Sequence, residues 1–361
     1  MIKVFKNFIL FLLSVFIIIS ILNCLFVWFS PKIVNNLSIN LINKIDKCYR
    51  TFYHTSLDKN YKDLKFILVI GDSYSEGMGD EFLSNDKNYG LINKIDTDIN
   101  LQEYLIFGRS GYGNISAYLE LDHCFYFLNK FTSLDISKEN INFIDFIFYE
   151  GNDLNNNLEE FEKFNIINDR LNKRRIMFFI PLFDLILSIP ELIQASKISS
   201  RKNEVKELNI KTQEKVIIPL PQSAATELND DQFIKSLEIL ATSILKTKQL
   251  FPKSEINLLY IPSVATSYPF QGRINVQSYR GKPFFSTTSE FNNKRSEKMR
   301  LTIKQFCKTS KNCNFCDSTL ELQETVINIG PIHGPIDWKH LNKNGYESLS
   351  KVYKACFNNK I

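Results

Sequence analysis

Apolar and polar positions alternate along the chain in a way that predicts strands and helices taking turns between residues 66 and 357. Five apolar or aromatic runs have the length of strands, at 66–70, 101–107, 143–149, 256–261 and 316–322. Apolar residues recur at helical spacing between several of them, most clearly at 115–129, and helices are also expected at 89–95, 231–249, 294–308 and 345–357. Such an alternation, with Gly-rich turns at strand ends, is typical of a parallel sheet covered on both faces.

Two stretches interrupt this rhythm. Residues 154–231 form a long insertion with a charged start, an apolar centre at 176–193 and a basic, Ser-rich end. Residues 263–289 are rich in Ser, Tyr and Gly and are expected to be a loop. The predicted organisation is therefore an anchor at 1–30, a connector at 31–65 and one α/β domain at 66–361 that contains the insertion.

The N-terminal apolar run predicts a membrane anchor. Residues 8–29 are 22 consecutive positions without a charge, and about 20 apolar residues span a bilayer core. Lys3 and Lys6 precede the run, which favours a cytoplasmic start and a domain outside the cytoplasm. A cleaved signal peptide is the alternative, but the apolar run is long for one and no small-x-small cleavage site follows. An uncleaved signal anchor is the preferred interpretation.

Composition narrows the function classes. The chain is 44% hydrophobic and 23% charged, as expected of a globular protein. Its net charge of +5 is spread over many Lys residues, which argues against nucleic acid as a partner.

The cysteines allow disulfides and argue against a metal site. Six of the seven cysteines follow the predicted anchor, so one or two disulfides near the C-terminal end are expected, with free buried thiols as the alternative. Cys313 and Cys316 have zinc-knuckle spacing, but no second such pair accompanies them, so no metal site is predicted. No cofactor is predicted either.

Candidate chemistry lies where predicted strands end. Ser73 directly follows the strand at 66–70, and the carboxyl end of a central parallel strand is where open α/β sheets bind ligands. A serine hydroxyl becomes a nucleophile only beside a base, which an acid holds in one tautomer. His340 is the candidate base, and Asp337, three residues before it, is the candidate acid.

An oxyanion hole is the third requirement of acyl-transfer chemistry. The candidate donors are the backbone N–H groups of Ser73 and Gly111 and the side-chain amide of Asn152, each of which follows a predicted strand. A parallel sheet would bring these donors to one edge. Asn supplies N–H groups without charge, and Gly111 leaves room for a substrate.

Four short blocks in this order resemble the SGNH hydrolases, also called the GDSL esterase/lipase superfamily. The blocks are Gly71-Asp72-Ser73-Tyr74, the turn around Gly111, Gly151-Asn152-Asp153 and Asp337-Trp338-Lys339-His340. The resemblance implies a flavodoxin-like three-layer α/β/α fold. It also implies Ser73 as nucleophile, His340 as base, Asp337 as acid, and Ser73, Gly111 and Asn152 as the oxyanion hole. Tyr74 stands where this family more often has Leu.

The resemblance implies an ester substrate but leaves the acceptor open. Water would make the protein an esterase, and a sugar hydroxyl would make it an acyltransferase. Its anchored members suggest an acetylated polysaccharide of the cell envelope as the partner. The apolar segment 176–193 keeps a lipase or phospholipase open, and a catalytically silent carbohydrate-binding protein is a further alternative. A second membrane span at 176–193 would separate Ser73 from His340, so a cap or a surface helix at the bilayer is expected there, or a solvated excursion without function.

Overall fold

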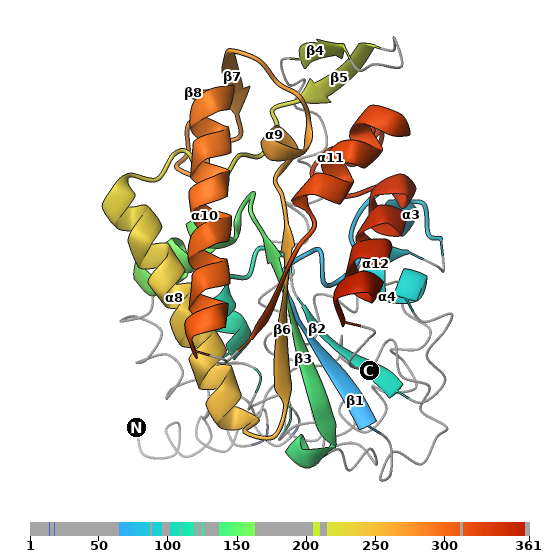
Figure 1. The fold of residues 1–361 in the computed structure, drawn as a ribbon, viewed down its shortest axis with the longest axis vertical. Helices are drawn as coiled ribbons and strands as arrows, with labels where there is room; N and C mark the ends of the chain where they lie inside the picture. The colour runs from blue at the N-terminus through green and yellow to red at the C-terminus, as the bar shows by residue number, and fades with distance from the viewer. Residues whose placement is uncertain are drawn as a thin grey trace, which may run out of the picture. The chain divides into compact units, whose positions relative to one another are not determined.

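The structure is a computed structural model that describes most of the predicted α/β domain (Figure 1). The described residues are Ser14, Ile18, 65–86, 89–95, 102–108, 110–118, 121, 125, 137–162, 205–209, 215–310 and 313–357. All of them except Ser14 and Ile18 belong to one compact unit, Thr51–Lys163 together with Asn203–Ile361. Among these described residues, no helix is long and apolar enough to cross a membrane. The predicted anchor at 8–29, apart from Ser14 and Ile18, and the apolar segment 176–193 lie outside the described residues.

Five parallel strands form the central sheet, in the order β2-β1-β3-β6-β9. Their bounds are β1 Lys65–Gly71, β2 Gln102–Gly108, β3 Ile141–Tyr149, β6 Glu255–Ile261 and β9 Asn314–Asp317. Numbered among themselves, they follow the flavodoxin-like order 2-1-3-4-5, whose direction reverses between the first and third strands. The predicted parallel α/β sheet is confirmed. The expected strand at 316–322 is wrong in its second half, because α11 begins at Thr319.

Helices cover both faces of this sheet, which gives three layers (Figure 1). In the view of Figure 1, α8 and α10 lie on one side, and α4, α11 and α12 lie on the other. Their bounds are α4 Gly90–Ile95, α8 Asp230–Leu250, α10 Ser289–Ser310, α11 Thr319–Asn328 and α12 Lys343–Phe357. In the predicted helix at 115–129, the residues that the structure describes, 115–118, 121 and 125, are helical.

Helix α8 shows why these segments fold as predicted. Phe233, Leu237, Leu240 and Ile244 are buried at helical spacing and form its inner face. Asn229 caps the first turn by accepting the N–H of Gln232, whose side chain bonds back to the Asn229 N–H.

The two irregular stretches contain hairpins that the sequence does not predict. Strands β4 (Val205–Asn209) and β5 (Lys215–Pro219) pair antiparallel within the insertion. Strands β7 (Arg273–Val276) and β8 (Phe285–Thr288) pair antiparallel within the expected loop, which also holds the short helix α9 (Val264–Ser267). Strands of four or five residues are too short for periodicity to reveal, because their pairing partner rather than their pattern stabilises them.

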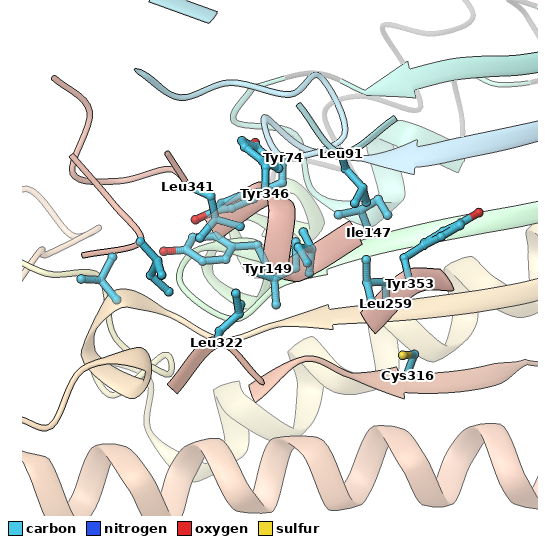
Figure 2. Close-up of a cluster of buried hydrophobic side chains, with 14 of the residues drawn as sticks. Tyr74, Leu91, Ile147, Tyr149, Leu259, Cys316, Leu322, Leu341, Tyr346 and Tyr353 are labelled. Carbon is cyan, nitrogen blue, oxygen red and sulfur yellow. The ribbon is translucent and has the colours of Figure 1, made fainter. Parts of the chain in front are cut away.

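The core reaches from the sheet to the carboxyl ends of its strands. Every residue of β1 from Phe66 to Gly71 is buried, as expected for a strand covered on both faces. Figure 2 shows Tyr74, Tyr149 and Tyr346 gathered beyond the strand ends, in one buried cluster with Ile147 and Tyr353. The side chains that continue the core therefore also surround the residues that follow the strands.

Two disulfides connect elements near the C-terminal end. Cys307 pairs with Cys313, and Cys316 pairs with Cys356. The second bond ties β9 to α12 across the sheet face. The expectation of C-terminal disulfides is confirmed, and Cys313 and Cys316 do not form a zinc knuckle, since each belongs to a different bond.

Candidate active site

Ser73 lies in a tight turn at the carboxyl end of β1. The carbonyl oxygen of Ser73 accepts the N–H of Met78, and that of Asp72 accepts the N–H of Glu76. Strand β3 lies beside β1, and Asn152 follows β3. Both residues therefore lie at the point where the strand order reverses, which is where doubly wound sheets bind their ligands.

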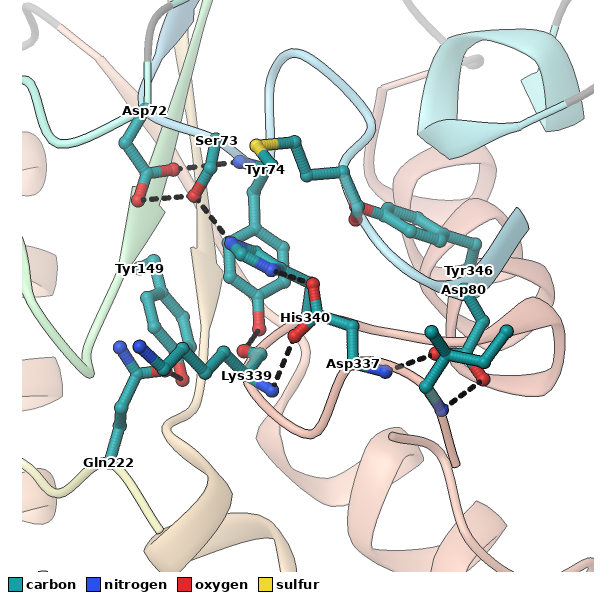
Figure 3. A network of polar contacts seen from close by, with 12 residues as sticks. Asp72, Ser73, Tyr74, Asp80, Tyr149, Gln222, Asp337, Lys339, His340 and Tyr346 are labelled. Atoms are coloured by element: carbon teal, nitrogen blue, oxygen red, sulfur yellow. Dashed lines mark hydrogen bonds and ion pairs between the residues drawn. The ribbon is translucent and has the colours of Figure 1, made fainter. Parts of the chain in front are cut away.

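Asp337, His340 and Ser73 form one continuous chain of hydrogen bonds (Figure 3). The Nδ1 atom of His340 lies 2.6 Å from Oδ2 of Asp337, and its Nε2 atom lies 2.7 Å from Oγ of Ser73. The side chains of Asp337 and His340 are each only 13% exposed. The structure thus joins residues 267 positions apart in the order that activates a serine hydroxyl.

Two side chains of the Ser73 turn hold the segment that carries His340. The carboxylate of Asp80 accepts the backbone N–H of Asp337 at 2.6 Å and that of Ile336 at 3.3 Å. The Tyr74 hydroxyl donates to the carbonyl oxygen of Lys339 at 2.9 Å, directly before His340. These contacts fix Asp337 and His340 relative to Ser73.

Gly79 lets the two segments come this close. Its φ of 150° lies in the range that favours glycine, and a Cβ at this position would overlap the carbonyl oxygen of Leu341. The positioning roles of Asp80 and Tyr74 were not predicted from the sequence, because their partners are backbone groups more than 250 residues away.

The electrostatics of the chain favour an ionised Asp337. Burial raises the pKa of Asp337, but the hydrogen bond and charge of His340 and the Lys339 N–H outweigh it, so this pKa lies below its usual range. The neighbouring Asp72 differs, because burial raises its pKa against the opposing effects of Tyr74, His340, Asn152 and Ser73. Its Oδ2 atom lies 3.3 Å from Oγ of Ser73 and is a second acceptor for the serine hydrogen.

The predicted oxyanion donors lie around this turn. The side-chain amide of Asn152 donates to Asp72 and so lowers its pKa, and the Asn152 side chain is 9% exposed. The turn of Gly111 is tied to the Ser73 turn, because the Ser110 N–H donates to Glu76 at 2.8 Å. Gly111 is exposed and has φ 76°, a left-handed conformation that suits glycine.

The buried carboxylate of Glu150 anchors the end of β3, two residues before Asn152. Glu150 is fully buried and accepts hydrogen bonds from the hydroxyls of four residues, Tyr260, Ser263, Thr266 and Ser296. Burial raises its pKa, and these hydroxyls oppose the rise. The donors come from β6, α9 and α10 or the residues beside them, so Glu150 fixes the end of β3 to three other elements.

The remaining described histidine does not join the chain. His333 is fully buried, and its Nδ1 atom lies 3.4 Å from the Tyr268 hydroxyl. Burial, helped by the charge of His340, lowers its pKa to about 3, so His333 is uncharged at neutral pH. In the described part of the chain, no group of three or more His, Cys, Asp or Glu side chains could hold a metal ion.

Among known proteins, this chain is similar to solved structures only. No protein-family model matches the chain, and no curated protein matches its sequence. A lipase from a goat rumen metagenome is similar in structure, with 13% identity, a TM-score of 0.43, and 81% of this chain and 97% of that chain covered.

Two further solved structures are similar. One is a catalytic mutant of an acetylxylan esterase from Geobacillus stearothermophilus, with 10% identity, a TM-score of 0.37, and 81% of this chain and 93% of that chain covered. The other is an alpha/beta hydrolase enzyme from the metagenome of Lake Arreo in Spain, with 11% identity, a TM-score of 0.35, and 82% and 97% covered.

Proposed function

We propose that the protein is a serine-dependent enzyme that acts on ester bonds through an acyl-enzyme. The observation that carries this proposal is the unbroken chain from Asp337 through His340 to Ser73, with contacts of 2.6 and 2.7 Å. The arrangement gives a buried hydroxyl a base within reach and gives that base an ionised partner. The order of the four sequence blocks, similar to that of the SGNH hydrolases, supports the same assignment.

The first half of the reaction forms the acyl-enzyme. Oγ of Ser73 attacks the ester carbonyl carbon while its proton passes to Nε2 of His340. The imidazolium that results is stabilised by the carboxylate of Asp337. The tetrahedral intermediate then collapses, the ester C–O bond breaks, and His340 returns the proton to the departing alkoxide.

The second half removes the acyl group. A water molecule, or the hydroxyl of a second sugar, gives its proton to His340 and attacks the acyl carbon, and Ser73 leaves with that proton. Hydrolysis and acyl transfer therefore share every residue of the chain and differ only in the acceptor.

The negative oxygen of each intermediate needs donors around Ser73. The backbone N–H groups of Ser73 and Gly111 and the amide of Asn152 fill this role in the proposal. Asn152 is held for it, because one N–H toward Asp72 leaves the second N–H of the same amide for the substrate oxygen. Removal of one such donor typically costs about 2.7–4 kcal/mol of transition-state stabilisation.

The proposed substrate is an acylated, most simply acetylated, carbohydrate of the cell envelope outside the cytoplasm. The support is the apolar run at 8–29 with Lys3 and Lys6 before it, which predicts an anchor with the catalytic domain on the far side. The lipase alternative depends on the apolar segment 176–193, which lies outside the described residues.

A fluorophosphonate probe tests the nucleophile. The full chain, purified in mild detergent, is expected to be labelled on Ser73, and Ser73→Ala is expected to abolish labelling. Ser75→Ala is the matched control, because Ser75 lies in the same turn but bonds to the Asp72 carbonyl oxygen instead of a base. Labelling that survives in Ser73→Ala would refute the assignment. Turnover of p-nitrophenyl palmitate in preference to p-nitrophenyl acetate would favour the lipase.

A further inference from the structure

Part of the insertion and part of the expected loop at 263–289 meet beside the Ser73 turn. The Gln277 N–H donates to the carbonyl oxygen of Pro221 at 3.0 Å. The carboxylate of Glu227 accepts the Ser278 hydroxyl at 2.7 Å and the Tyr279 N–H at 2.8 Å. Residues 221–227, between β5 and α8, therefore hold the segment that follows β7 in place.

A hydrogen-bond relay runs through these segments from the end of β3. The Tyr149 hydroxyl donates to Oε1 of Gln222 at 2.7 Å, and Nε2 of Gln222 donates to the Tyr279 hydroxyl oxygen at 2.7 Å. The direction of the relay leaves Tyr279 with its own hydroxyl hydrogen. Within the part of the chain that the structure describes, this hydrogen has no acceptor. Tyr279 is only half-buried, so a partner from outside the chain can reach this hydrogen and satisfy it.

The relay lies next to the catalytic residues. The ring centroids of Tyr149 and Tyr74 are 4.3 Å apart, and those of Tyr74 and His340 are 5.3 Å apart. Figure 3 shows Tyr149 and Gln222 on the side of His340 where Ser73 lies. Tyr279 shares this environment: burial raises its pKa first, and the charges of Asp72 and Asp153 raise it further.

We propose that the Tyr279 hydroxyl is a specificity-determining donor that binds a hydroxyl or ring oxygen of a polyhydroxylated substrate held at Ser73. This inference rests on the proposed ester chemistry and names the side of the substrate that the site selects. Sugars carry hydroxyl and ring oxygens directly beside an acylated position, whereas a simple alkyl or aryl ester such as p-nitrophenyl acetate has no hydroxyl or ring oxygen there. A site that keeps a donor for such an oxygen discriminates strongly against substrates that lack it.

The relay explains why this donor is held firmly. Tyr149 and Gln222 fix the oxygen of Tyr279, and Glu227 fixes its backbone, so little rotational freedom is lost on binding. Tyr149 stays in place because its ring packs against the ring of Tyr74 in the core (Figure 2).

Steady-state kinetics of the full chain test the proposal with two substrates, p-nitrophenyl acetate and partially O-acetylated xylo-oligosaccharides. Tyr279→Phe is expected to lower kcat/KM for the oligosaccharide roughly 5- to 100-fold, mainly through KM, the range expected for one lost hydrogen bond. It should leave kcat/KM for p-nitrophenyl acetate within about twofold of the wild-type value. Gln222→Met keeps the side-chain length and removes both relay bonds, so it should shift oligosaccharide turnover in the same direction.

Tyr149→Phe removes the first bond of the relay but leaves the Tyr279 hydroxyl in place, so it should lower kcat/KM for the oligosaccharide less than Tyr279→Phe does. The proposal is overturned if Tyr279→Phe lowers kcat/KM equally for both substrates, or lowers it for neither. It is also overturned if wild-type protein turns over p-nitrophenyl acetate but no acetylated oligosaccharide. If wild-type protein shows no Ser73-dependent turnover of either substrate, the ester chemistry itself is wrong and this inference fails with it.

Discussion

Replacement of Asp337 by Asn is predicted to leave the site intact in shape and almost inactive. The two carboxylate oxygens of Asp337 have different partners: Oδ1 accepts the Lys339 N–H at 2.9 Å, and Oδ2 lies 2.6 Å from Nδ1 of His340. An Asn side chain has one acceptor, and the Lys339 N–H requires it. Its NH₂ group then faces Nδ1 of His340 as a donor, so the imidazole hydrogen moves to Nε2, where Ser73 needs a lone pair.

Two effects set the size of the loss. The chain would lose a negative charge beside the imidazolium; for two charges about 4 Å apart at an effective dielectric of about 20, that interaction is worth about 4 kcal/mol. This corresponds to roughly 10³ in rate. The unfavourable tautomer adds to it, and roughly 10⁴ is the expected total loss of kcat.

Turnover of p-nitrophenyl acetate measures this loss, with the melting temperature as a check on folding. Asp337→Ala is the informative control, because Ala cannot donate to Nδ1 and His340 keeps its favourable tautomer. Asp337→Asn should therefore be no faster than Asp337→Ala. An Asn variant that keeps more than about a tenth of wild-type kcat, or that clearly exceeds the Ala variant, would refute the tautomer argument.

Two further predictions concern Tyr74 and Asp145, which are not members of the Asp337–His340–Ser73 chain. Tyr74→Phe removes the hydroxyl that holds the Lys339 carbonyl oxygen, so kcat should fall roughly 5- to 30-fold with KM unchanged; an unchanged kcat would show that the His340 segment stays in place without this bond. Burial raises the pKa of Asp145 to about 6, so the folded protein holds this proton more tightly than the unfolded chain, and the resulting stability is present below about pH 4 and is lost as pH rises through 6. About two units correspond to about 3 kcal/mol, so urea unfolding at pH 4 and pH 7.5 should show a smaller loss of stability in Asp145→Asn than in wild type, and equal losses would contradict the assignment.

The sequence points to the residues proposed to carry the chemistry because that chemistry restricts residue type. Asp337 and Ser73 each lie within hydrogen-bond distance of His340, as the residue types and the short spacing from Asp337 to His340 suggest. Long apolar runs such as β1 and β3 are equally readable, since a strand buried on both faces is mostly apolar, with the hydrogen-bonded Asp145 of β3 as an exception.

Short elements and long-range contacts could not be predicted from the sequence. The four-residue strands β7 and β8 look like loop sequence until they pair, and residues 319–322 look like strand until α11 packs on its neighbours. Propensity is a weak signal over four residues, and tertiary packing overrides it.

Only the tertiary structure decided which groups contact each of the proposed catalytic residues. The Tyr74 and Asp80 side chains bind backbone groups of the His340 segment, and Gln222 connects the end of β3 to Tyr279. These partners are hydrogen-bonding groups that any sequence supplies in abundance, so no pattern marks them. The sequence alone predicted the sheet and pointed to Ser73, His340 and Asp337 as the proposed nucleophile, base and acid, because burial and acyl chemistry constrain residue type. The surroundings that position these residues and face the substrate depend on distances that only the fold sets.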